Sequence, residues 1–167
     1  MEVIDNFLPE EVYQDLVNNV CFQSRVPLHF QQTVSHPQGM DTNTELWNWY
    51  AIHNFYTNHR PVSEYYDNIM NIFQNSLPNF QSLLRIKLNF YPHTETLREH
   101  GQHVDFDFPN HAAIYSLNTC DGFTRLSDGT KIDSVANRML FLDGFSLHNS
   151  STTTNAKGRY NINFNYL

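Results

Sequence analysis

The feature that most constrains this chain is a change of hydrophobic period close to residue 81. Before it, apolar residues recur at helical spacing in two stretches, and after it apolar and polar residues alternate along short segments. In the segment 85–91, Ile86, Leu88 and Phe90 lie on one face and Arg85, Lys87, Asn89 and Tyr91 on the other. A period of two is typical of a strand with one buried face. The second half therefore predicts a sheet structure.

The same pattern predicts the other strands and one hairpin. We expect strands at Leu28–Val34, Trp49–Phe55, Ala112–Leu117, Phe123–Leu126, Lys131–Val135, Met139–Leu142 and Arg159–Tyr166, and a polar loop at 35–46. The tetrapeptide Ser127-Asp128-Gly129-Thr130 predicts a hairpin turn, because Asp-Gly tolerates positive φ.

Two helices are expected before the sheet. The first runs from Pro9 to about Val20, with an apolar stripe of Val12, Leu16 and Val20 together with Tyr13 and Val17. The second runs from Ser63, as N-cap, to Leu77, and its buried side carries Tyr66, Met70, Phe73 and Leu77. With the strands that follow, this order predicts an antiparallel sandwich or barrel supported by N-terminal helices.

Charge and composition exclude several classes of protein. The net charge is −7 with only ten Lys and Arg, which disfavours a nucleic-acid binder because such proteins need cations against phosphates. No apolar run approaches the roughly 20 residues of a membrane span. The N-terminus has no basic patch before an apolar stretch, as a signal peptide would have. Cys21 and Cys120 form no CxxC pair and are interpreted as reduced thiols, so we expect a cytoplasmic protein.

Nine histidines in so short a chain raise the question of a metal. On a strand, residues i and i+2 point the same way, so His103-Val104-Asp105 aims an imidazole and a carboxylate at one point. A third ligand completes a facial site of two histidines and one carboxylate, which is diagnostic of non-haem iron(II) oxygenases. His148, after the apolar segment Met139–Leu142, is the candidate. The alternative is a surface histidine beside a solvated aspartate, and His100 is a rival ligand expected to face away.

Arg159 opens the last strand and points to an anion site. Alternation places it on the same face as the three asparagines Asn161, Asn163 and Asn165. An arginine that faces into a barrel is costly unless it is paired with an anion, and a carboxylate held in a bidentate manner meets that need. The polar face then lines a pocket; the alternative is an edge strand with this face in water.

At this point the sequence resembles the 2-oxoglutarate- and iron(II)-dependent oxygenases, and within them the prolyl-4-hydroxylase-like branch. The ordered set consists of the opening Val3–Glu11, Tyr91-Pro92, His103-x-Asp105, Ile114–Asn118, His148 and Arg159-Tyr160-x-Ile162. The resemblance implies a double-stranded β-helix, a jelly-roll or cupin-like fold that is mainly β (α+β), with the N-terminal helices packed on one sheet. It implies one domain over 1–167, with 1–81 as the supporting region and 82–167 as the barrel core that holds the metal.

The resemblance also implies roles for individual residues. His103, Asp105 and His148 would hold iron(II), Arg159 would pair with the distal carboxylate of 2-oxoglutarate, and Tyr91 would donate a hydrogen bond to it. Ser116 stands where human-type prolyl hydroxylases have a co-substrate-binding tyrosine, and the neighbouring Tyr115 is expected to point out of the barrel. Asn89 and Asn161 match asparagines that bind the co-substrate in alkylated-base demethylases of the same superfamily, and Asn163 faces the pocket by alternation.

The implied activity is that of a dioxygenase that hydroxylates a C–H bond. It couples oxidative decarboxylation of 2-oxoglutarate to succinate and CO2, using O2, with hydroxylation of a peptidyl proline or a small polar substrate, and ascorbate is a possible reductant. The expected partner is a peptide or a small molecule. Two alternatives stay open: a demethylase of alkylated bases in nucleic acid, which the −7 charge disfavours, and a non-catalytic jelly-roll binding module.

Overall fold

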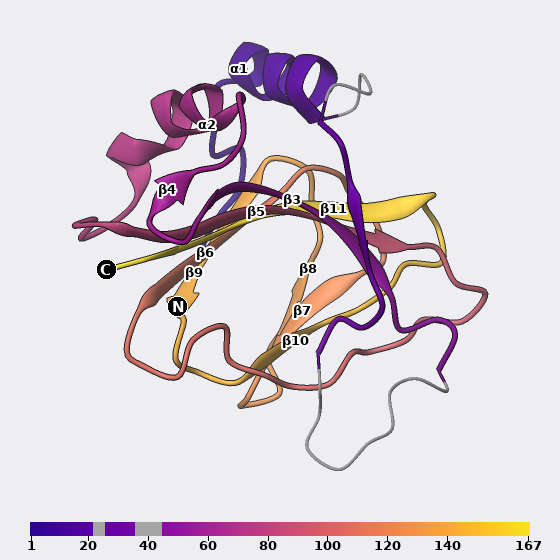
Figure 1. Ribbon diagram of the computed structural model, residues 1–167. Helices are drawn as coiled ribbons and strands as arrows, with labels where there is room; N and C mark the ends of the chain where they lie inside the picture. Colours follow the sequence, from indigo (N-terminus) through magenta and orange to yellow (C-terminus); the bar gives the residue numbers. More distant parts are fainter. Residues whose placement is uncertain (22–25, 36–44) are drawn as a thin grey trace.

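The computed structural model describes residues 1–21, 26–35 and 45–167, the side chains of 19–21 excepted. Its elements form three layers, with helices above a large sheet and a small sheet below it (Figure 1). The large sheet has the order β1-β9-β6-β11-β5-β3-β2, and β4 pairs with β3. Its strands are β1 (Glu2–Ile4), β2 (His29–Gln31), β3 (Tyr50–Thr57), β4 (Arg60–Pro61), β5 (Leu83–Pro92), β6 (His111–Ser116), β9 (Arg138–Asp143) and β11 (Gly158–Tyr166).

The small sheet faces the large one and has the order β10-β7-β8. Its strands are β7 (Phe123–Leu126), β8 (Lys131–Asp133) and β10 (His148–Ser150). The long connection between β5 and β6 runs beside β10, where isolated bridges join His103 to His148 and Glu99 to Ser151. Two facing antiparallel sheets of this kind form a jelly roll, which confirms the expected fold class.

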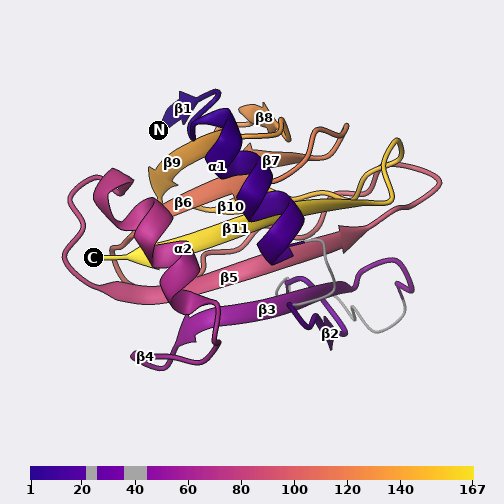
Figure 2. The same cartoon turned by 90° about the horizontal axis from the view of Figure 1, so that it is seen from above.

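The main apolar core lies between the helices and the upper face of the large sheet. In Figure 2, α1 (Glu10–Asp15) and α2 (Tyr66–Phe73) cross over the strands of this sheet. The helices contribute Tyr13, Leu16, Ile69 and Phe73 to the core, and β5 and β11 contribute Ile86, Leu88, Ile162 and Phe164. The alternation of β5 and β11 therefore sends their apolar residues up to the helices and their polar residues down between the sheets. This confirms the expected packing of the helices on one sheet.

The hairpin is confirmed, and several boundaries differ from expectation. β7 and β8 pair antiparallel across Ser127–Thr130, with Gly129 at φ 87° and Asp128 accepting a hydrogen bond from the Thr130 backbone N–H. β5, β6, β9 and β11 lie within one or two residues of the predicted strands, whereas β2 and β8 are shorter than predicted. β10 was not predicted, because His148, Asn149 and Ser150 are all polar and buried and so show no alternation. Most of the predicted loop 35–46 lies outside the described residues.

Both helices are shorter than their sequence patterns predict. α1 ends at Asp15 and continues as a π-helical turn over Leu16–Cys21, which changes the helical period. Of the predicted apolar stripe, Tyr13, Leu16 and Val17 are buried, while Val12 is 37% exposed. α2 begins at Tyr66 rather than after Ser63, whose hydroxyl instead accepts a hydrogen bond from the Tyr65 backbone N–H. α2 ends at Phe73 and is followed by a 3-10 turn, Gln74–Ser76, before the buried Leu77.

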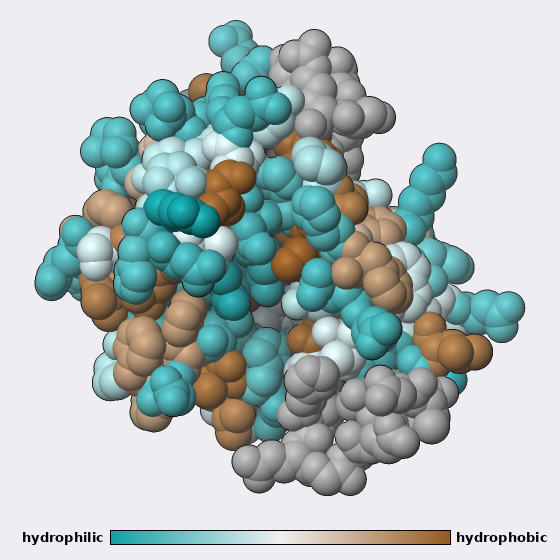
Figure 3. Space-filling model, viewed as in Figure 1, coloured by the Kyte–Doolittle hydropathy of each residue, from teal (hydrophilic) through white to brown (hydrophobic). Residues whose placement is uncertain are grey.

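One face of the molecule is mainly polar. On the face drawn in Figure 3, hydrophilic residues predominate and hydrophobic residues form separate small groups. None of the helices in the described segments is long and apolar enough to span a bilayer. Cys120 is a buried free thiol, as expected for a reduced cysteine, whereas the Cys21 side chain lies outside the described residues.

Candidate active site

Two histidines and one aspartate converge between the sheets. One possible ligand atom from each of His103, Asp105 and His148 lies within 4.8 Å of the others, and Nε2 of His148 is 4.0 Å from Oδ2 of Asp105. The expected grouping of these three residues is therefore present in the structure. The local structure differs from expectation, because His103 and Asp105 lie in the β5–β6 connection and not in a regular strand. His103 is held by its backbone bridge to His148, with both N–H···O distances near 3.0 Å.

Each imidazole is oriented by a backbone carbonyl. Nδ1 of His103 lies 3.2 Å from the Gly101 carbonyl oxygen, and Nδ1 of His148 lies 3.0 Å from that of Ser146. A carbonyl only accepts, so each Nδ1 donates, and Nε2 is left as the ring nitrogen that could bind a metal. A hydrogen bond from the other ring nitrogen to a carbonyl is the contact that commonly orients histidine ligands toward a metal.

Asp105 is held as an anion by groups from the large sheet. Its Oδ1 lies 2.6 Å from Nη2 of Arg85, and its Oδ2 accepts hydrogen bonds from Asn163 at 2.9 Å and Asn165 at 3.0 Å. Burial alone would raise the pKa of this carboxyl. The positive charges of Arg85 and Lys87, a contribution from His148 and the Asn163 hydrogen bond outweigh burial, so the pKa lies below its usual range. Asp105 is therefore ionised at neutral pH.

His103 is held neutral. Burial lowers its pKa, and the neighbouring His148 lowers it further, while Asp105 and the hydrogen bond to Gly101 act in the opposite direction. A neutral imidazole is the form that binds a metal. The cluster thus presents two imidazole nitrogens and one anionic oxygen, which is a donor set suited to a divalent transition metal such as iron(II).

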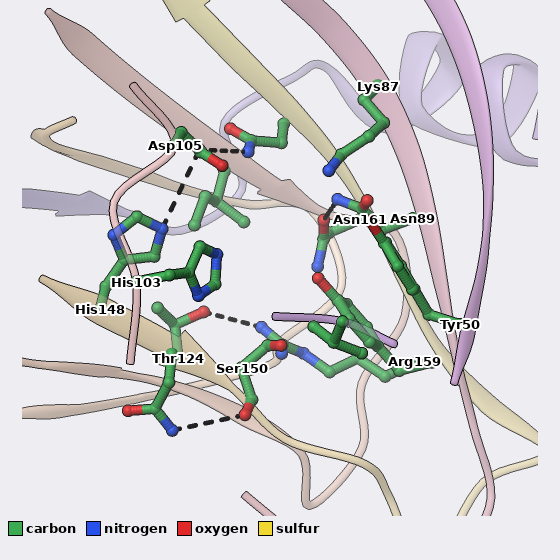
Figure 4. Close-up of a pocket in the computed structure, with 15 residues that line it drawn as sticks. Tyr50, Lys87, Asn89, His103, Asp105, Thr124, His148, Ser150, Arg159 and Asn161 are labelled. Carbon is green, nitrogen blue, oxygen red and sulfur yellow. Dashed lines mark hydrogen bonds and ion pairs between the residues drawn. The ribbon is translucent and has the colours of Figure 1, made fainter. Parts of the chain in front are cut away.

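A cavity connects this cluster to polar residues of both sheets. Figure 4 shows His103, His148 and Asp105 on one side of it and Asn89, Asn161 and Arg159 across from them. Its lining is Val34, Tyr50, Lys87, Asn89, Tyr91, His103, Asp105, Ile114, Thr124, His148, Asn149, Ser150, Arg159, Asn161 and Asn163.

Arg159 lies at the cavity with donors to spare. Its side chain is 1% exposed, Nη2 donates to Thr124 Oγ1 at 2.8 Å, and its Nε and Nη1 find no hydrogen-bond acceptor among the described residues. Gly122 makes room for it, because a Cβ there would lie 2.8 Å from Cδ of Arg159. A buried guanidinium with open donors is destabilising by itself and fits a carboxylate, which a guanidinium can bind through two parallel hydrogen bonds.

The other predicted co-substrate residues fall into two groups. Tyr91, Asn89, Asn161 and Asn163 line the cavity as alternation predicted. The Tyr91 ring lies 5.5 Å under the Arg159 guanidinium, and Asn89 donates to Asn161 Oδ1 at 2.9 Å. Ser116 is buried but does not line the cavity. Tyr115 points into the core on the helix side and donates to Asn137 Oδ1 at 2.7 Å, as expected.

Sequence reasoning left several cavity residues unassigned. The sequence places Arg85 and Lys87 on the polar face of the segment 85–91 without a role, and in the structure Arg85 forms an ion pair with Asp105 and Lys87 lines the cavity. The alternation of β5 carries this signal, since both share a face with Asn89 and Tyr91. Tyr50, Thr124 and Ser150 come from strands without a regular polar pattern, and no sequence signal indicated them.

His100 is not part of the ligand cluster. Its Nδ1 lies 2.9 Å from Ser150 Oγ, and its ring packs between Trp47 and Tyr91 at 5.5 and 5.4 Å. Burial lowers the pKa of His100 to about 3, with smaller contributions from Arg159 and His103. A hydrogen bond to Ser150 acts in the opposite direction. His100 is therefore a neutral residue that packs behind Tyr91.

Solved structures share this architecture across nearly the whole chain. A prolyl hydroxylase from Trichoplax adhaerens, solved with a hypoxia-inducible-factor peptide fragment, superposes with a TM-score of 0.60 at 19% identity over 99% of this chain and 82% of its own. A prolyl-4-hydroxylase from Pseudomonas putida gives 0.59 at 14% identity over 99% and 91%. A 2OG-Fe(II) oxygenase family protein from Burkholderia pseudomallei gives 0.66 at 13% identity over 95% and 83%.

This chain has the fold of 2-oxoglutarate- and iron(II)-dependent oxygenases. The resemblance indicated by the sequence is thereby confirmed at the level of the fold. At the level of sequence, no protein-family model and no curated protein matches the chain. The oxygenase fold and the local chemistry of the cavity are thus two separate observations that agree.

Proposed function

We propose that this protein is an iron(II)- and 2-oxoglutarate-dependent dioxygenase, a hydroxylase of the prolyl-4-hydroxylase type that acts on a peptidyl proline or a small polar substrate. The observation that carries the proposal is a single cavity with His103, Asp105 and His148 on one side and the open guanidinium of Arg159 on another. A facial N,N,O donor set and a buried carboxylate receptor are the two features that an iron(II) and keto-acid pair requires.

Each residue has a distinct task in this proposal. His103, Asp105 and His148 hold the metal, and Arg159 with Tyr91 and the amides of Asn89 and Asn161 holds the distal carboxylate of 2-oxoglutarate. Iron(II) and 2-oxoglutarate, when bound, supply the oxidising chemistry that couples decarboxylation to C–H hydroxylation. The protein fixes the orientation of both, and its two sheets keep bulk water from the reacting atoms.

Arg85, Asn163 and Asn165 have a positioning role. Their three contacts to Asp105 hold the carboxylate ionised and fix which oxygen faces the histidines. Loss of such outer-sphere contacts commonly lowers metal affinity by 10- to 100-fold.

The proposal is tested by anaerobic titration of the protein with iron(II) and 2-oxoglutarate. A keto acid chelated to iron(II) gives a visible metal-to-ligand charge-transfer band, and we expect this band in the wild-type protein. His103→Ala removes one ligand and is expected to abolish the band. His93→Ala, at an exposed position outside the cluster, is the matched control and should retain it.

Two outcomes contradict the proposal. The first is a well-folded wild-type protein that gives no band at saturating iron(II) and 2-oxoglutarate. The second is a His103→Ala variant that gives the band in full. Release of succinate from 2-oxoglutarate in the presence of O2 is the companion measurement, and it also distinguishes a dioxygenase from a non-catalytic jelly-roll module.

A further inference from the structure

Lys87 is a cation in the cavity to which no role has yet been given. It lies on β5 two residues before Asn89, and its side chain is directed between the sheets. In Figure 4 it enters from the side opposite Thr124 and Ser150, which belong to the small sheet. Its Nζ lies over the Tyr50 ring, 5.4 Å from the ring centroid. The described residues give it no hydrogen bond and no ion pair.

An ammonium in this position weakens the folded state of the ligand-free protein. Burial and, to a smaller extent, repulsion from Arg85 lower the pKa of Lys87 to about 7. Attraction to Asp105 acts in the opposite direction. Asp105 attracts Lys87 but forms no ion pair with it, and both carboxylate oxygens of Asp105 are already engaged by Arg85, Asn163 and Asn165. A half-buried cation in the cavity wall that forms no ion pair with the described residues is better explained by a ligand than by stability.

Two amide oxygens near Lys87 are also open. Oδ1 of Asn163 and Oδ1 of Asn89 are buried and find no hydrogen-bond donor among the described residues. Their orientations are fixed, because the Nδ2 of Asn163 donates to Asp105 and that of Asn89 donates to Asn161. Asn163 is the direct cross-strand partner of Lys87. The wall beside the metal cluster thus offers one positive charge and two acceptors that need N–H or O–H donors.

The proposed co-substrate does not supply the missing anion. One carboxylate of 2-oxoglutarate is assigned to Arg159, and the keto-acid end is assigned to the metal ligands. Arg159 is the cross-strand partner of Tyr91, and Lys87 lies four residues before Tyr91 on β5. Four residues of strand span about 13 Å, so the backbone positions of Lys87 and Arg159 are about that far apart along the sheet. A third anionic group is therefore required to pair with Lys87, and it must come from the substrate.

We propose that the substrate is a small molecule of the amino-acid class, whose carboxylate pairs with Lys87 and whose N–H donors bind the amide oxygens of Asn163 and Asn89. Lys87 is then a specificity-determining residue. This inference rests on the proposed function and narrows its substrate from a peptidyl proline or a small polar molecule to a free carboxylate beside an N–H group. A residue within a peptide chain has an amide in place of that carboxylate.

The test compares acids with their amides. Each of the twenty standard L-amino acids is paired with its α-amide, and a capped proline peptide is included. Binding is measured by calorimetric titration into protein loaded with zinc(II) and 2-oxoglutarate, which is unable to turn over, and again into metal-free protein. We expect at least one acid to bind about 10- to 100-fold more tightly than its amide, which is the range for a hydrogen bond to a charged group.

Three variants assign the effect to the residue. Lys87→Met is expected to lose the preference for the acid, and Lys87→Arg to keep most of it because it keeps the charge. Lys157→Met, at an exposed lysine in the loop before β11, is the matched control and should bind as the wild type does. A thermal unfolding scan checks that Lys87→Met is folded; we expect it to be at least as stable as the wild-type protein without ligand.

The outcomes separate the alternatives. If the amides or the capped peptide bind as tightly as the acids, if none of the twenty acids binds, or if Lys87→Met keeps the acid preference, the inference is wrong. If Lys87→Met instead weakens 2-oxoglutarate by the same factor, Lys87 belongs to the co-substrate and the inference is again wrong. None of these results affects the charge-transfer band in the wild-type protein, whose absence would contradict the proposed function itself.

Discussion

At the scale of single residues, His100, which packs against Tyr91 of the cavity wall, should make the folded state less stable in acid. Its pKa is lowered to about 3 by burial, whereas the same imidazole in the unfolded chain titrates near 6.5. The unfolded chain therefore binds a proton first as the pH falls, and the folded state is progressively disfavoured from about pH 6.5 down to about pH 3. Above pH 6.5 both states are neutral and His100 contributes no pH dependence.

Replacing His100 with leucine should remove this dependence. Between pH 7.5 and 4.5 we expect the wild-type protein to lose about 3 kcal/mol more unfolding free energy than His100→Leu, since two pKa units correspond to about 2.7 kcal/mol. Urea unfolding at the two pH values measures the difference. His93→Leu, at an exposed histidine after β5, is the control and should behave as the wild type. Equal losses in the wild-type protein and His100→Leu would show that His100 is protonated in the folded state.

Residue patterns predicted the grouping of His103, Asp105 and His148 better than the composition of the cavity wall. The spacing of His103 and Asp105, the position of His148 and the polar face of β11 were sufficient to identify the groups that meet between the sheets. Lys87 was not assigned, although alternation put it on the correct face. Alternation says which face a side chain is on, but how far the cavity extends along β5 depends on the β5–β6 connection, which has no regular period.

At the scale of elements, Asn137 attaches the N-terminal segment to the barrel. Its side chain accepts hydrogen bonds from the Leu8 backbone N–H and the Tyr115 hydroxyl, and it donates to the Leu8 carbonyl oxygen. Its backbone has φ 60°, a left-handed conformation that favours asparagine or glycine. It therefore connects the start of α1 with β6 and β9. The edge strand β1 pairs with β9.

Two substitutions separate the hydrogen bonds of Asn137 from its backbone conformation. Asn137→Ala loses three buried hydrogen bonds and adds backbone strain, and we expect it to lower the unfolding free energy by about 3 kcal/mol. Asn137→Gly relieves the strain and should be about 1 kcal/mol more stable than Asn137→Ala. Denaturant unfolding measures both. A loss below about 0.5 kcal/mol in both variants would mean that the N-terminal segment is not held through Asn137.

Elements with a clear period were predicted closely, and those without one were not. β5 alternates over 85–91 and β11 over 159–166, because one face packs under the helices and the other lines the cavity. β10 is buried and polar throughout, so only its pairing with β7 and its bridge to His103 make it a strand. The π-helical turn Leu16–Cys21 has no sequence signal that a period of 3.6 would detect.

At the scale of the whole molecule, the charges are divided between an acidic surface and a cationic interior. The chain has ten Lys and Arg and a net charge of −7, yet Arg85, Lys87 and Arg159 all point between the sheets. Asp105 is the carboxylate that faces them in the cavity lining. This distribution leaves few cations for an outer stripe and disfavours nucleic acid as a partner. It also means that the ligand-free fold carries uncompensated positive charge, which bound carboxylates would neutralise.

The free energy of unfolding should therefore increase when ligands bind, and the increase caused by 2-oxoglutarate should require Arg159. With zinc(II) present and 2-oxoglutarate at about 100 times its dissociation constant, binding adds about 2.7 kcal/mol. For a domain of this size that is a Tm increase of about 5–10 °C by differential scanning calorimetry. Arg159→Met removes the carboxylate receptor and should show no increase with 2-oxoglutarate, although its ligand-free Tm is expected to equal or exceed that of the wild-type protein.

The control for this measurement is another arginine of the same barrel. Arg125 on β7 forms an exposed ion pair with Glu99 at 2.8 Å, so Arg125→Met removes a guanidinium without touching the cavity. It should keep the full response to 2-oxoglutarate, with a ligand-free stability within about 1 kcal/mol of the wild-type protein. A ligand-free Arg159→Met that unfolds far below the wild-type protein would show that Arg159 stabilises the fold. The same 2-oxoglutarate response in Arg159→Met and wild type would place the carboxylate elsewhere. Because Arg159 and Lys87 should gain carboxylate partners when ligands bind, the ligand-free fold is expected to be less stable than the ligand-bound fold.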